Sequence, residues 1–152
     1  MEYTSQQKKR WLQRYRTLGR EVDRLNRQID KALQEIDAIR ATAEKSTTIP
    51  TGMPSGGGFK GPEDVWVKLI DLSNEVNRLV DKYVDERRVA ERKLSEIVMA
   101  INDIDDGTLS TLLLMRYVDG ATFEQIAVDM GYCIMQILRL HGKALEKLGA
   151  RE

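Results

Sequence analysis

Apolar residues recur along the first 45 residues at alternating steps of four and three, with polar residues between them. Such spacing is the heptad seam of a coiled coil. It predicts one helix from about Ser5 to Glu44, roughly 60 Å long at 1.5 Å per residue, which needs a partner helix to cover its apolar side. The seam consists of Trp11, Tyr15, Leu18, Val22, Leu25, Ile29, Ala32, Ile36 and Ile39.

Residues 46–62 interrupt this pattern with three prolines, five glycines and several Ser and Thr residues. This composition is typical of a flexible linker. The glycines do not form a phosphate-binding loop, because that motif requires Ser or Thr after its Lys, whereas Lys60 is followed by Gly61. We therefore expect a linker between two helices.

A second long helix is predicted over residues 63–104. Pro62 suits its first turn, and the acidic Glu63 and Asp64 suit the positive end of its dipole. A parallel row of Trp66, Ile70, Val80 and Val84 widens the apolar stripe and favours a bundle of three or more helices. The expected seam, with a stutter between Ala90 and Leu94, consists of Val65, Leu69, Leu72, Val76, Leu79, Tyr83, Ala90, Leu94, Ile97, Ile101 and Ile104.

Charge is distributed unevenly along a chain whose net charge is zero. Residues 1–45 carry 11 basic and 7 acidic side chains, and residues 63–106 carry 7 basic and 12 acidic ones. Opposite charge favours pairing of the two long helices as a helical hairpin, with further self-association. In the alternative interpretation, the start of the first helix is a basic arm that contacts DNA phosphates. The residues of this arm would be Lys8, Lys9, Arg10, Arg14, Arg16 and Arg20.

Residues 107–149 predict three short helices. The first spans Leu109 to Val118. Thr122 and Gln125 form a capping box at the start of the second, and Gly131 supplies the turn before the third, which begins near Cys133. The expected fold class is therefore all-α: two long coiled-coil helices followed by a C-terminal three-helix unit that contains a helix-turn-helix.

The run LLLMRYVDGATFEQIA, residues 112–127, resembles region 4 of bacterial sigma factors. With the following helix, the segment over residues 107–149 is similar to phage-encoded late transcription regulators of the RinA/ArpU type. The resemblance implies a transcription regulator of phage or prophage late genes that binds double-stranded DNA as a homo-oligomer. The resemblance also suggests two further partners, RNA polymerase and a phage or satellite regulatory protein.

In that family the second helix of the motif enters the major groove. Gln136 has the chemistry to pair with adenine, Arg139 with guanine and Lys143 with phosphate. Ile134 and Met135 suit thymine methyl groups, a protein partner, or burial against the long helices, and we prefer the DNA interpretation. The expected DNA-binding residues are Thr122, Ile134, Met135, Gln136, Arg139 and Lys143.

Other classes of function find little support in the sequence. His141, expected to be exposed near phosphate, lies roughly 12 Å along the helix from Cys133, so the two cannot form a catalytic pair. We expect no enzymatic activity, cofactor, metal site or membrane segment, and a location in the cytoplasm of a bacterial host. The alternatives to a transcription regulator are a DNA-packaging adaptor resembling a small terminase subunit, and a protein-binding inhibitor or decoy.

Overall fold

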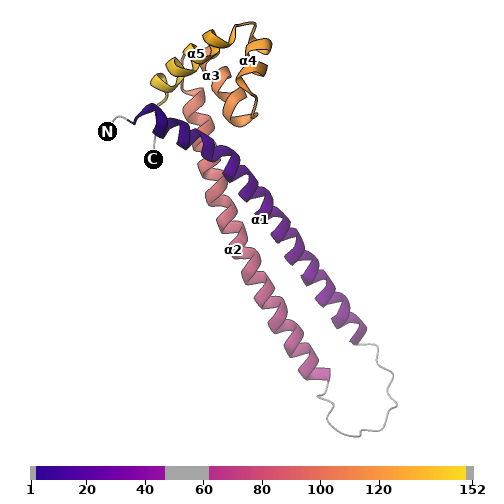
Figure 1. Cartoon of the computed structure of the whole chain (residues 1–152). Helices are drawn as coiled ribbons and strands as arrows, with labels where there is room; N and C mark the ends of the chain where they lie inside the picture. Colours follow the sequence, from indigo (N-terminus) through magenta and orange to yellow (C-terminus); the bar gives the residue numbers. More distant parts are fainter. Residues whose placement is uncertain (1–2, 47–61, 150–152) are drawn as a thin grey trace. The chain divides into compact units, whose positions relative to one another are not determined.

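The computed structural model of the chain describes residues 3–46 and 62–149, and the elements in this part are all helices (Figure 1). The all-α prediction is therefore confirmed for these residues. The predicted linker lies outside them, except for its end residues 46 and 62. The elements are α1 (Ser5–Ser46), α2 (Pro62–Asn102), α3 (Gly107–Leu113), the π-helix η1 (Leu114–Val118), α4 (Phe123–Met130) and α5 (Ile134–Lys147).

The chain forms two compact units, and each long helix contributes to both. The long-helix unit is Asp23–Arg87. The C-terminal unit combines Met1–Val22 with Arg88–Glu152. In the described part of the chain, no helix is both long and apolar enough to cross a membrane.

In the long-helix unit, α1 and α2 pack through the expected seam of α1, in which Leu25 and Ile29 are buried. Farther along α1, Ala32 and Ile36 form a cluster with Val76 of α2. Near the other end of the unit, Arg87 Nη1 donates a hydrogen bond to Asn26 Oδ1 at 3.0 Å. Since later residues of α1 meet earlier residues of α2, the two segments run antiparallel.

The predicted seam of α2 is wrong at two of its positions, because Leu72 and Leu79 are 47% and 41% exposed. Val76 and Val80 pack against α1 in this part of the helix. The side of α2 that faces α1 therefore combines Val76 of the predicted seam with Val80 of the parallel row, and the apolar pattern alone did not identify this side. The half-buried Arg87 also belongs to the observed seam. From Arg87 the seam advances by three residues to Ala90 and by four to Leu94, which is the regular alternation of a heptad, so the expected stutter is absent.

The core of the C-terminal unit includes the start of α1, far away in the sequence. Leu12 is completely buried there, and Trp11, Tyr15 and Leu18 pack against the same core. A segment of about 45 residues has little apolar surface to bury by itself, so α1 and α2 supply the missing part. The fully buried side chains of this core include Leu12, Ile97, Ile101, Leu112, Leu113, Ile126, Ile137, Leu145 and Leu148.

Local signals fix the ends of α3 and η1. The Asp106 carboxylate caps α3 by accepting hydrogen bonds from Thr108 N at 3.0 Å and Leu109 N at 3.4 Å. η1 ends at a wide turn in which Asp119 N donates to the Leu114 carbonyl at 3.0 Å. Gly120 follows with φ of 76°, a conformation that glycine adopts without strain. The chain then enters α4.

Candidate nucleic-acid interface

The turn between α4 and α5 is built from the signals that the sequence predicts. Thr122 caps α4: its Oγ1 accepts from Gln125 N at 3.2 Å, and Thr122 N donates to Gln125 Oε1 at 2.9 Å. Gly131 ends α4 in the left-handed conformation, with φ of 72°. Tyr132 N then donates to the Ala127 carbonyl at 3.0 Å. This hydrogen bond holds the turn against the end of α4.

Helix α5 has one buried and one exposed side. Ile137 and Leu145 are fully buried in the core of the C-terminal unit, whereas Gln136, Arg139 and Lys143 are exposed. At steps of three and four these polar residues follow one edge of the helix. They line a shallow hollow of about 220 Å³ together with Tyr132 and Leu140.

Exposed hydrogen-bond donors therefore lie side by side on α5. The Gln136 carbonyl oxygen is already engaged, because it accepts from Cys133 N at 3.4 Å, but its amide NH₂ group remains available as a donor. Arg139 adds a guanidinium fork that suits guanine or phosphate, and Lys143 adds a point charge that suits phosphate. The exposed Tyr132, at 39%, is a member of this group that the sequence reasoning missed.

The exposed side of α5 also carries apolar side chains. Ile134 is 44% exposed, Met135 63% and Leu138 45%. The interpretation that Ile134 and Met135 are buried against the long helices is therefore wrong for the isolated chain. The physical reason is their position on α5: Met135 lies about 160° round the helix from Ile137, and Ile134, although only about 60° from Ile137, is the first residue of the helix. These side chains are available to a ligand or a partner.

His141 is buried, which contradicts the expected exposed position near phosphate. It is only 5% exposed, and its Nε2 lies 2.9 Å from the Tyr117 hydroxyl. The Phe123 ring meets the imidazole edge to face, with 5.1 Å between centroids. His141 follows Ile137 by four residues and precedes Leu145 by four, so it belongs to the buried side of α5. It fills the core and is not part of the interface.

The charge state of this buried pair follows from its surroundings. Burial first, and then the positive charges of Lys9 and Arg116, lower the pKa of His141 from 6.5 to about 4. Burial raises the pKa of Tyr117, partly offset by Arg116. The Arg116 guanidinium lies over the Phe123 ring, 4.3 Å from its centroid. At neutral pH both His141 and Tyr117 are therefore uncharged.

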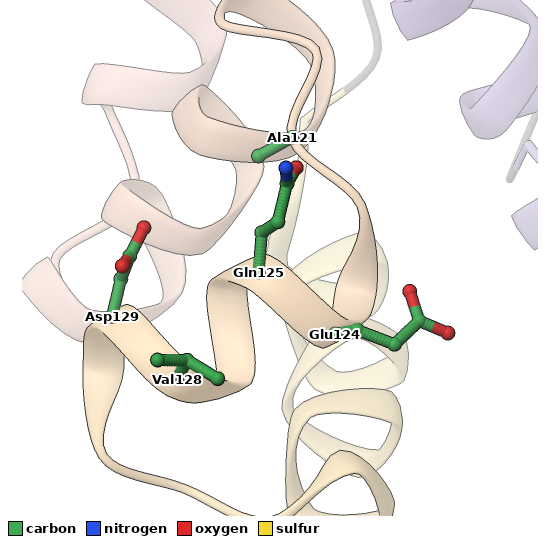
Figure 2. Close-up of a pocket in the computed structure, with 5 residues that line it drawn as sticks. All are labelled: Ala121, Glu124, Gln125, Val128 and Asp129. Carbon is green, nitrogen blue, oxygen red and sulfur yellow. The ribbon is translucent and has the colours of Figure 1, made fainter.

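The outward side of α4 differs from α5 in charge. Its residues line a hollow of about 460 Å³. In Figure 2, Gln125 extends towards Ala121, and the carboxylates of Glu124 and Asp129 lie at opposite ends of this group of residues. Val128, 81% exposed, lies between them. Two carboxylates repel phosphate oxygens, so this side of α4 is unsuited to nucleic acid.

The six residues predicted to bind DNA thus fall into three groups. Gln136, Arg139 and Lys143 share one exposed edge of α5, and Ile134 and Met135 lie on its exposed apolar part. Thr122 lies at the start of α4, where its hydroxyl is engaged in the cap.

Comparison with known proteins gives a family and no function. Searches of curated proteins and of solved structures find no match to the chain. One family's sequence model matches residues 42–149, a region that contains α2 to α5 and most of the C-terminal unit. Since this region covers well over half of the 152 residues, the chain belongs to the family described as "Protein of unknown function (DUF1492)".

Proposed function

We propose that this protein is a DNA-binding transcription regulator in which α5 is the recognition helix of a helix-turn-helix. One observation carries this proposal: Gln136, Arg139 and Lys143 lie together on the exposed edge of α5. Their side chains are those used most often to read adenine and guanine and to hold phosphate. Helices that read DNA place such residues in the first half of the recognition helix, where Gln136 and Arg139 are found.

The connection between α4 and α5 supports the same proposal. The capped start of α4, the left-handed Gly131 and the short turn to Cys133 are the parts that a helix-turn-helix requires. The resemblance to sigma factor region 4 and to regulators of the RinA/ArpU type adds a role. We propose activation of phage or prophage late genes, with RNA polymerase as a further partner.

Self-association is the second part of the proposal. The long-helix unit leaves apolar side chains uncovered on both of its helices, including Leu33 at 46%, Ile70 at 53%, Leu72 at 47% and Leu79 at 41%. Side chains of this kind on a helical pair favour packing against a second copy. An oligomer would present several copies of α5 to one DNA molecule, which raises affinity without new contacts.

The test is selection of duplexes from a random-sequence library, followed by affinity measurements on a selected and a scrambled duplex. Arg139→Ala is expected to weaken binding to the selected duplex by about 5- to 150-fold, equivalent to 1–3 kcal/mol, and binding to the scrambled duplex by less. Lys143→Ala is expected to weaken both equally, because a phosphate contact carries no sequence information.

A matched control uses the exposed Lys31 and Arg40 of the long-helix unit. Lys31→Ala plus Arg40→Ala removes the same charge as Arg139→Ala plus Lys143→Ala, but it should leave affinity for the selected duplex nearly unchanged. The proposal fails if the protein binds no duplex at low salt, or if both double variants bind as tightly as the wild type.

A second function, binding to a protein, is favoured by the exposure of Met135 and Leu138 on the same helix. Exposed apolar groups of this size mark interaction sites. Substitution of Met135 by Ser separates the two functions. A loss confined to a protein complex, with DNA affinity unchanged, would assign the apolar part of α5 to a protein partner.

A further inference from the structure

The start of α1 is positively charged and belongs to the same compact unit as α5. Residues 3–22 contain six basic side chains and one acidic one, whereas residues 107–149 contain four of each. The segment that holds the recognition helix is therefore neutral by itself. The fold supplies the missing positive charge from α1, a part of the chain about a hundred residues away.

Two basic side chains attach α1 to the rest of the unit. Lys8 Nζ donates to the carbonyl oxygens of Leu145 at 2.9 Å and Glu146 at 3.3 Å, in the last turn of α5. The Arg16 guanidinium carbon lies 2.9 Å from the place where a β-carbon on Gly120 would stand. The first turns of α1 are thus held against the end of α5 and against the loop before α4.

The remaining basic residues of α1 divide into two sides. Leu12 is fully buried, so Arg10 and Arg14, each two residues from it and thus about 200° round the helix, point away from the unit. Lys9 and Arg20 lie about 60° and 80° from Leu12 on the flank that also carries Arg16. The Arg16 guanidinium of this flank lies against Gly120, and the positive charge of Lys9 contributes to the lowered pKa of His141 in α5, so this flank borders the unit.

The length of α5 brings phosphates near this flank. Its 14 residues span about 21 Å at 1.5 Å per residue, whereas the major groove is about 12 Å wide. A helix whose first half lies in the groove must therefore pass the sugar-phosphate backbone near its last turn. Lys8 binds that last turn, so its neighbour Lys9 lies close to the backbone, and Arg20 follows on the same flank of α1, roughly 17 Å farther along the helix.

We infer that Lys9 and Arg20, on the flank of α1 that borders the C-terminal unit, contact phosphates of the duplex held by α5. This inference rests on the proposed DNA binding and adds a second contact surface to it. Both side chains are exposed, and neither has a hydrogen-bonding or ion-pairing partner among the described residues. Such contacts would raise affinity for every sequence equally, because they involve no base edges.

The test compares two charge-matched double variants of the full chain. Lys9→Gln plus Arg20→Gln changes the flank that borders the unit, and Arg10→Gln plus Arg14→Gln changes the opposite side. Affinity for a labelled mixed-sequence duplex of about 30 base pairs is measured as a function of salt. Each phosphate contact contributes about 0.9 to the slope of log affinity against log salt. Circular dichroism of each variant verifies that it is folded.

The first variant is expected to lower this slope by about 1.8 and to weaken binding about 10- to 30-fold at 0.15 M salt. The second should change the slope by less than about half of that amount. Equal effects of the two variants, or an unchanged slope in the first, would overturn the inference while the proposed function stands. A wild-type protein without affinity for any duplex at low salt would overturn both.

Discussion

Acid is expected to destabilise the C-terminal unit through a single side chain, His141. The imidazole is buried, 2.9 Å from the Tyr117 hydroxyl and edge to face with Phe123. Burial, followed by the charges of Lys9 and Arg116, lowers its pKa from 6.5 to about 4. The fold therefore holds His141 in its neutral form and resists its protonation.

The sign of the effect follows from the direction of this shift. Between pH 6.5 and about 4 the unfolded chain binds a proton at His141 and the folded chain does not. The contribution of His141 to the free energy of unfolding is thus fully present above pH 6.5 and is lost as the pH falls through this window. With 1.36 kcal/mol for each pKa unit, the loss between pH 8 and pH 5 is about 2 kcal/mol.

Urea unfolding at pH 8 and pH 5 measures this loss, and His141→Gln is the matched variant because it cannot titrate. The difference between the two pH values should be about 2 kcal/mol larger in the wild type than in the variant. His141 is the only histidine in the chain, so its imidazole resonance can be followed directly by NMR. A titration midpoint near 6.5 in the folded protein would refute the reasoning.

Three substitutions and one control substitution test other parts of the fold by urea unfolding. Leu12→Ala should destabilise the C-terminal unit by about 2–5 kcal/mol, whereas Met99→Ala, at a site of the same unit that is 65% exposed, should cost less than about 1 kcal/mol; equal losses would contradict the burial of Leu12 in the core of this unit. Asp106→Ala removes the cap of α3 and should cost about 1 kcal/mol; a neutral result would mean that the two hydrogen bonds of Asp106 add nothing. Gly142→Ala should stabilise the protein by about 0.5–1 kcal/mol, since no atom outside its own turn of helix lies within 4 Å of the new β-carbon; destabilisation would reveal a contact at that position.

Local signals predicted the helices well. The capping box at Thr122, Gly131 at the end of α4 and Pro62 at the start of α2 act over a few residues, so the sequence alone reveals them. Exposure of Gln136, Arg139 and Lys143 also follows from helical spacing, because these residues alternate with the buried Ile137 and Ala144. Their role in DNA binding stays a prediction.

Contacts between distant segments were not predictable in this way. Trp11 and Leu12 are adjacent and both apolar, and only the packing against α2 and α5 makes Leu12 the fully buried one. For the same reason the sequence did not show that Val76 and Val80 face α1 while Leu72 and Leu79 are exposed. Periodicity shows that a helix has an apolar side, but it does not show which neighbour covers each row.

His141 and Tyr132 illustrate the same limit at the candidate interface. A polar residue on a helix is usually exposed, yet the Tyr117 hydroxyl of η1 provides the partner that allows His141 to be buried. Tyr132 joins Arg139 and Lys143 only because the turn after Gly131 folds back towards α5. Neither contact follows from the spacing of residues along one helix.

The most direct test of DNA binding by α5 uses a residue that the chain already contains. Cys133 is the only cysteine, and it is exposed immediately before the first residue of α5. The rate at which a maleimide modifies its thiol is measured with and without a saturating amount of duplex DNA selected for binding. If α5 enters the major groove, bound DNA covers Cys133 and slows the modification of its thiol by about tenfold or more. If DNA binds and the rate of modification at Cys133 is unchanged, the proposal is contradicted.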